Sequence, residues 1–201
     1  MSSTRFTPDV PPPAPGEDEH ASLQLANSSV QMPNGRIEML NSPAVATSWL
    51  IEHGLAPQET ELQEHCSGLL ISMRRHIRDL FEAAAFGRPP ETSAVEAVNE
   101  ALTRTPSARL LGWDPVSGFR DQPTHPTSRI VEHALAAVAG DAVVLLTGPE
   151  AELLAACGAE QCNRYMIRTH ARRHWCSKRC GDRVRAARSY ALRKERLAKV
   201  G

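Results

Sequence analysis

Four cysteines near the C-terminus have the spacing of metal ligands. Cys157, Cys162, Cys176 and Cys180 form two close pairs, which thirteen residues separate. Two cysteines with three or four residues between them can present both sulfurs to one metal ion, and two such pairs complete a tetrahedron. Four thiolates are the usual closed shell of a structural zinc site, with no open position for a substrate. The sequence therefore predicts one structural Zn²⁺ ion per chain.

Two other interpretations of these cysteines stay open, namely disulfides and a chance cluster of core thiols. The N-terminus lacks the apolar core of a signal peptide, so we expect a cytoplasmic protein with reduced thiols. His170 and His174 could substitute as ligands, but four thiolates already complete the shell. The fifth cysteine, Cys66, occupies an apolar position of a predicted helix and is expected to be a buried thiol.

Charge is strongly segregated along the chain, although its net charge is +0. Residues 157–201 hold 13 Lys/Arg and three acidic residues, whereas residues 1–156 hold 10 Lys/Arg and 20 acidic residues. In the basic part arginine outnumbers lysine ten to three, which favours bidentate binding of phosphate or guanine. The residues predicted to contact nucleic acid are Arg172, Arg173, Lys178, Arg179, Arg183, Arg185, Arg188, Arg193, Lys194 and Arg196. The alternative is a solvated helix that pairs with the acidic body of the same chain.

The elements that must position the cysteines are predicted from periodicity, caps and turns. Residues 1–20 are rich in proline and acidic residues, so we expect a disordered leader. The pattern predicts helices over residues 42–53, 59–86, 93–102 and 127–146, the last interrupted near Gly140-Asp141, with a short helix after Gly148-Pro149. It also predicts a strand at 36–40, a hairpin at 110–120, a second hairpin between the cysteine pairs, and a basic helix that starts at Cys180. The fold class is mainly α with a few short strands (α+β). A helical domain over residues 21–152 precedes a treble-clef-like finger over residues 153–201.

The finger resembles the CGNR zinc finger of bacterial proteins. The matching residues are Cys157, Cys162, Arg172, Arg173, Trp175, Cys176, Ser177, Cys180, Gly181 and Arg183. Two features depart from the family: Asp182 replaces its asparagine, and three residues instead of four separate Cys176 from Cys180. A carboxylate at position 182 could cap the basic helix but would repel phosphate. Upstream, the segments LQLANS, NGRIEML and SPAVATSWLIEHGL resemble the start of the ABATE domain, a family described as stress-induced transcription regulators.

The resemblance implies a zinc-dependent transcriptional regulator that binds double-stranded DNA through the finger. Its N-terminal domain would sense a small-molecule effector or form a homodimer. Asn27 falls where the family has an Asn-Thr pair, so it could line a ligand pocket or serve in a structural turn. The alternative function is a zinc-stapled module that binds protein or RNA. The sequence carries no catalytic motif and no run of about eighteen apolar residues, so we expect neither an enzyme nor a membrane span.

Overall fold

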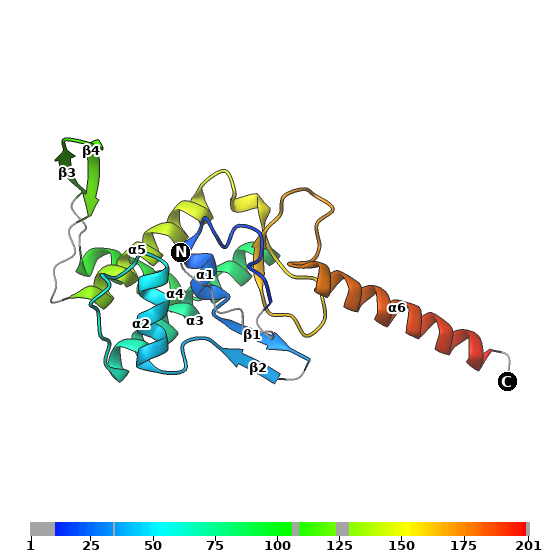
Figure 1. Cartoon of the computed structure of the whole chain (residues 1–201). Coiled ribbons are helices and arrows are strands. Elements are labelled where there is room, and N and C mark those ends of the chain that lie inside the picture. Colours follow the sequence, from blue (N-terminus) through cyan, green and yellow to red (C-terminus); the bar gives the residue numbers. More distant parts are fainter. Residues whose placement is uncertain (1–10, 34, 106–108, 124–128, 200–201) are drawn as a thin grey trace.

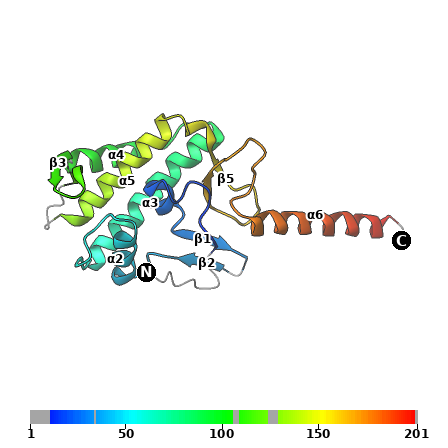
Figure 2. The same cartoon turned by 45° about the horizontal axis from the view of Figure 1, so that its top comes forward.

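The computed structural model of the chain describes residues 11–33, 35–105, 109–123 and 129–199. The helices α3 (Glu64–Phe86), α4 (Thr92–Arg104) and α5 (Ile130–Thr147) pack against one another and form the centre of the body (Figures 1 and 2). The apolar residues that recur at helical spacing on α3 face this core, and Leu70, Ile77 and Phe81 are fully buried. The predicted class, mainly α with short strands, is confirmed.

Short elements cover this centre. Helix α1 (Ala21–Ala26) packs against α3 and α5, and α2 (Pro43–Glu52) packs against α3. Ser42 caps α2 by accepting a hydrogen bond from the Val45 amide, as the Ser-Pro start predicts. The strands β1 (Ser29–Met32) and β2 (Gly35–Glu38) form an antiparallel pair, so the strand predicted near residue 36 is present.

Two helix boundaries differ from the prediction. Helix α3 begins at Glu64 instead of residue 59, and α5 runs through Gly140 and Asp141 without interruption. A Cβ at Gly140 would lie 3.8 Å from Leu102 Cδ2, which is an ordinary contact distance, so the packing against α4 does not require glycine there. The Asp141 carboxylate accepts a hydrogen bond from the Ser22 amide at 2.8 Å. A tertiary contact therefore uses Asp141, a residue of low helix propensity, inside the continuous helix.

A hairpin and an apolar helix complete the N-terminal part. The strands β3 (Arg109–Asp114) and β4 (Gly118–Pro123) form the predicted antiparallel hairpin, which projects from the end of the body opposite the finger (Figure 1). Over the described residues α5 is the one helix long and apolar enough to cross a membrane, and half of its residues are buried. It contacts α1, α3 and α4, which is the environment of a core helix.

The C-terminal part differs from the predicted finger in its strands. After a short 3-10 helix, η1 (Ala151–Leu153), strand β5 (Leu154–Ala156) pairs antiparallel with β6 (Tyr165–Ile167). The hairpin therefore encloses the first cysteine pair instead of lying between the two pairs. Helix α6 (Lys178–Ala198) starts two residues before Cys180, because Ser177 caps it by accepting from the Cys180 amide. Figures 1 and 2 show α6 pointing away from the body.

The residues that precede α1 pack against the finger. We call residues 11–20 the N-terminal strap; they differ from the predicted disordered leader, whose residues 1–10 lie outside the described residues. The Ile167 amide donates to the Pro15 carbonyl at 2.9 Å. Gly16 has a φ of +86°, and a Cβ there would lie 2.5 Å from Ile167 Cγ1, so only glycine fits. The composition of this segment predicted disorder, but residues 11–20 are ordered because their partners lie about 150 residues away in the sequence.

Candidate metal centre and basic helix

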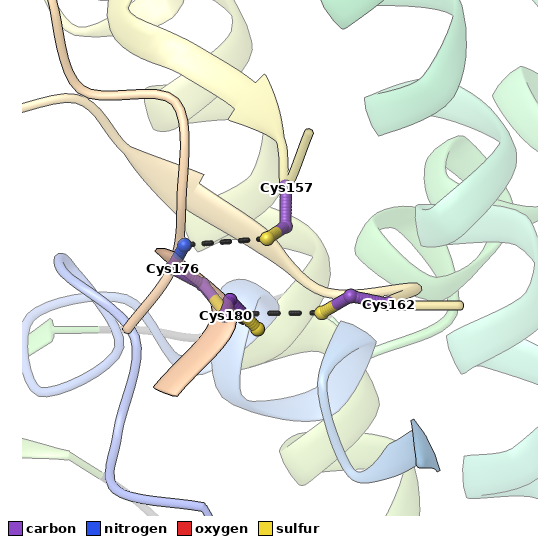
Figure 3. Close-up of side chains that lie close together, drawn as sticks. All are labelled: Cys157, Cys162, Cys176 and Cys180. Carbon is purple, nitrogen blue, oxygen red and sulfur yellow. Dashed lines mark hydrogen bonds between the residues drawn. The ribbon is translucent and has the colours of Figure 1, made fainter. Parts of the chain in front are cut away.

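The four predicted ligands meet at one point. Cys157 follows β5, Cys162 ends the turn between β5 and β6, Cys176 precedes α6, and Cys180 lies in its first turn (Figure 3). All four sulfurs lie within 4.8 Å of one another. The Cys176 sulfur is 3.8 Å from that of Cys162 and 3.6 Å from that of Cys180.

These distances fit a tetrahedral zinc ion. With Zn–S bonds of about 2.3 Å, the sulfurs of a regular tetrahedron lie about 3.8 Å apart. The set contains only thiols, three of them buried and Cys162 partly buried, which leaves no open position for substrate. The cluster holds one structural zinc ion. The disulfide interpretation does not fit, because all five cysteines are free.

The backbone around the first pair prepares this geometry. The Cys157 amide donates to the Arg164 carbonyl at 2.8 Å, and the Cys162 amide donates to Ala159 at 3.0 Å. Gln161 between them has a φ of 63°, a left-handed conformation that turns the chain back toward the metal site. The second pair is fixed to the first, since the Cys176 amide donates to the Cys157 sulfur at 3.3 Å.

The thiols of the cluster depend on one another for their ionisation. Hydrogen bonds from Cys162, and next from Cys176, hold the pKa of Cys157 at about 2, so one thiolate is strongly favoured. The hydrogen bond with Cys157 raises the pKa of Cys162 to about 12, and hydrogen bonds with Cys157 and Cys162 raise the pKa of Cys176. Four adjacent thiolates need a compensating positive charge, which a divalent cation supplies as the protons leave.

A buried ion pair lies beside the metal centre. Arg164 Nη2 donates to both carboxylate oxygens of Glu17, at 2.8 and 2.9 Å, and Nη1 donates to the Pro12 carbonyl. Burial lowers the pKa of Arg164, but Glu17 and the neighbouring Cys176 and Cys162 outweigh that effect and raise it. Arg164 therefore neutralises charge inside the protein and is not available to a partner.

Asn27 joins the end of α1 to the finger through its side chain. Its side chain exchanges two hydrogen bonds of 2.9 Å with the main chain of Tyr165, so the end of α1 continues the hairpin β5–β6. The same amide donates to Glu17. Because these bonds occupy the buried side chain, they fit the alternative, a structural turn, whereas the ligand contact at Asn27 stays a prediction.

The start of α6 differs from the expectation for Asp182. Ser177 is the N-cap, whereas Asp182 lies one turn inside the helix and pairs with Arg185 at 2.6 Å. The Arg185 guanidinium also lies 5.7 Å from the centre of the Trp175 ring. Arg183 Nη2 lies 3.7 Å from the Cys180 sulfur and donates to the Glu160 carbonyl at 3.2 Å. Of the predicted contacts, Arg183 and Arg185 are thus partly used in supporting the finger.

Most of the remaining basic residues are exposed. Helix α6 carries eight basic and two acidic residues and is exposed on every side from Arg185 to Ala198. Its apolar residues are exposed too, with Tyr190 at 72% and Leu197 at 68%, so the helix does not dock on the acidic body. Arg173 is half-buried and contacts Thr169. The exposed predicted residues are Arg172, Lys178, Arg179, Arg185, Arg188, Arg193, Lys194 and Arg196.

Sequence analysis missed the residues that join the finger to the body. Glu17 appeared as one acid of a polar leader, and Arg78 as an ordinary polar position of a long helix. In the structure Arg78 donates to the Ala26 and Asn163 carbonyls, each at 2.7 Å, and lies 5.0 Å from the centre of the Tyr165 ring. A signal in the sequence could have indicated the role of Arg78. The residue directly follows Ile77, which belongs to the apolar face of the helix, so Arg78 lies at the edge of that face.

Two family models match the chain along nearly its whole length. Residues 19–149 match the ABATE family, described as "Putative stress-induced transcription regulator". Residues 154–193 match the CGNR zinc finger, and this range contains the four cysteines. No curated protein matches the chain. The boundary between the two matches falls in η1, immediately before β5.

Proposed function

The chain belongs to the ABATE family and carries a CGNR zinc finger, and from this premise we propose that it is a zinc-dependent, DNA-binding transcriptional regulator of the cytoplasm. In this proposal α6 binds double-stranded DNA, and the helical domain senses an effector or forms a dimer. The carrying observation is that α6 is basic, exposed and separate from the body.

The dimensions and charge of α6 suit the major groove. A helix of 21 residues is about 31 Å long, and a groove about 12 Å wide admits an α-helix. Arg188, Arg193 and Arg196 are exposed and carry guanidinium groups that bind phosphates or the edge of guanine. The acidic body would be repelled by DNA, which favours an approach through α6 alone.

Zinc has a defined part in this proposal. Cys180 lies in the first turn of α6, so the metal ties the start of the helix to Cys157 at the end of β5. The hairpin β5–β6 is in turn part of the main core through Leu154, Tyr165 and Ile167. The metal thereby fixes the direction in which α6 leaves the body, and loss of zinc would release the helix.

A salt titration of DNA binding by the full zinc-loaded chain tests the proposal. If about six to eight basic residues contact phosphates, a plot of log K for DNA binding against the logarithm of the salt concentration should have a slope of about −5 to −7. A variant with Arg188→Gln, Arg193→Gln and Arg196→Gln should bind more weakly and reduce the slope by about 3. Absence of duplex binding by the zinc-loaded chain would instead favour the alternative, a module that binds protein or RNA.

The projecting hairpin supports a dimer as part of the same proposal. Trp113 and Phe119 are register partners and share one face of β3–β4 with Leu111. Their exposures are 63%, 74% and 77%. A two-stranded hairpin alone is only marginally stable in water, and a cluster of exposed apolar side chains is typical of an interaction site. A second copy would offer the same face, as isologous dimers require.

A further inference from the structure

A second basic site lies in the helical domain, away from α6. Arg36 on β2 and Arg74, Arg75 and Arg78 on α3 line one cavity of about 430 Å³. Ile71 and Ser72 complete much of its wall. Four arginine side chains thus line one space in a part of the chain that is otherwise acidic.

The charges around this cavity are not balanced. Arg74 is paired with Glu38, at 2.6 and 2.7 Å, and also donates to the Ser28 hydroxyl. Arg36 donates to the Ser29 hydroxyl, and Arg78 donates only to carbonyl oxygens. Arg75 is exposed and has no ion pair with any residue that the structure describes. Among the described residues, Glu38 is the one carboxylate that pairs with any of these four arginines, while Glu82, whose charge also acts on Arg78, pairs with Arg88.

This imbalance has an energetic effect on Arg78. Burial is the main cause that lowers the pKa of Arg78, and the neighbouring charges of Arg74 and Arg36 lower it as well, against the opposite effects of Tyr165 and Glu82. Because arginine stays protonated in proteins, the repulsion persists as a cost to the folded state. A bound anion would remove that cost, and guanidinium groups match the geometry of phosphate oxygens.

We propose that the cavity formed by Arg36, Arg74, Arg75 and Arg78 binds a phosphate group, either of a small phosphorylated ligand or of the DNA backbone. Its concave form and its distance along the chain from α6 favour the small ligand. The net charge of the four arginines and Glu38 fits a ligand with two or three negative charges, such as a phosphate ester or a diphosphate. The site would supply the class of ligand for the sensing role proposed above. Phosphate binding itself does not depend on that role, and only the link between the cavity and the finger rests on it.

Arg78 connects this cavity to the metal-binding finger. Asn163, whose carbonyl accepts from Arg78, is the residue that follows Cys162. The Asn163 side chain also binds β1, by donating to the Ser29 carbonyl at 3.0 Å and accepting from the Gln31 amide at 2.7 Å. A phosphate that draws Arg78 outward would therefore compete with its bond to the turn holding Cys162.

Calorimetric titration with pyrophosphate tests the site without any DNA. The wild type should bind pyrophosphate, and Arg75→Gln should weaken binding about tenfold, since it removes an exposed cation that has no ion pair among the described residues. Arg120→Gln, which removes an exposed arginine from the distant hairpin, should leave binding unchanged. No binding by the wild type, or equal losses in both variants, would overturn the proposal.

A second arm distinguishes the two sources of phosphate. For a small ligand, Arg75→Gln should leave DNA affinity within about twofold of the wild type while pyrophosphate binding falls. If the cavity instead contacts the DNA backbone, Arg75→Gln should lower DNA affinity and reduce the salt slope by about 1, and pyrophosphate should displace DNA competitively. Because pyrophosphate binding is measured on the free protein, failure of DNA binding does not affect this test.

Discussion

Glu17 and Arg164 form a buried ion pair that joins the N-terminal strap to the finger. The arginine side chain is 3% exposed and the glutamate side chain 11%, so water screens their interaction little. The strap, the metal centre and the body therefore share one folded unit, and the finger should not be treated as an independent module.

The Glu17→Gln variant tests this connection. The change leaves the Arg164 guanidinium buried without its counter-charge, so the free energy of unfolding should fall by about 3 kcal/mol. Urea denaturation of the zinc-loaded chain measures the effect. The matched control is Asp18→Asn, at an exposed neighbouring position, which should change stability by less than about 0.5 kcal/mol. Equal stabilities of Glu17→Gln and the wild type would show that the pair contributes nothing.

The Cys176→Ser variant should lose the zinc ion. Three thiolates and a hydroxyl bind zinc far less tightly, so the metal content should fall from one ion per chain toward zero. Because Tyr165 and Ile167 belong to the main core, we expect the melting temperature of the whole chain to fall as well. Cys66→Ser is the control and should keep its zinc. Undiminished zinc in Cys176→Ser, by elemental analysis, would refute the ligand assignment.

Asp182→Asn should strengthen DNA binding. The change removes a negative charge from the exposed start of α6 and releases Arg185 from its ion pair. We expect a salt slope steeper by about 1 if Arg185 then contacts a phosphate. Finger stability should change by less than about 0.5 kcal/mol, because the pair is exposed and Ser177 remains the cap. Identical DNA affinities over a salt titration would place the contact further along, near Arg188 to Arg196.

His20 should make stability depend on pH. Its ring nitrogens contact Asp141 at 3.0 Å and Glu150 at 3.1 Å. Burial lowers the pKa of His20, but the two carboxylates together raise it above its ordinary 6.5. A raised folded-state pKa gives stability that is complete below 6.5 and is lost as the pH rises through the folded value.

The His20→Asn variant isolates this contribution. It should destabilise the protein more at about pH 6 than at about pH 9, as measured by urea denaturation at both. His65→Asn, at an exposed position of α3, is the control, and its stability should depend on pH as that of the wild type does. The zinc thiolates make the opposite contribution to the pH dependence of stability, because they bind metal better at high pH. That contribution is common to the variant and the wild type, so it cancels in their comparison. A loss in His20→Asn that is the same at both pH values would contradict the prediction.

Trp113→Ser should weaken self-association. If the exposed face of β3–β4 pairs with its copy, removal of its central aromatic side chain should raise the dimer dissociation constant at least about tenfold. Sedimentation equilibrium measures this constant. Val144→Ser, which changes a comparably exposed apolar residue on α5, is the control and should have no effect. A wild-type protein that stays monomeric at high concentration would rule out the hairpin as a dimer contact.

The sequence by itself determined the features that depend on short-range chemistry. The four cysteines identified the zinc site because metal geometry constrains their spacing, and Ser42-Pro43 and the periodicity of α3 located helices through local rules. The hairpin at 110–120 followed in the same way from its turn and its flanking apolar residues.

Only the tertiary structure decided how these parts are joined. It brought Glu17 to Arg164, turned Asn27 into a partner of Tyr165, paired β5 with β6 around the first cysteines, and gathered Arg36 with three arginines of α3. The polar residues involved lie far apart in the sequence, and each resembles an ordinary surface residue when considered alone. Their roles arise because burial removes water and leaves each charge or amide dependent on one particular distant partner.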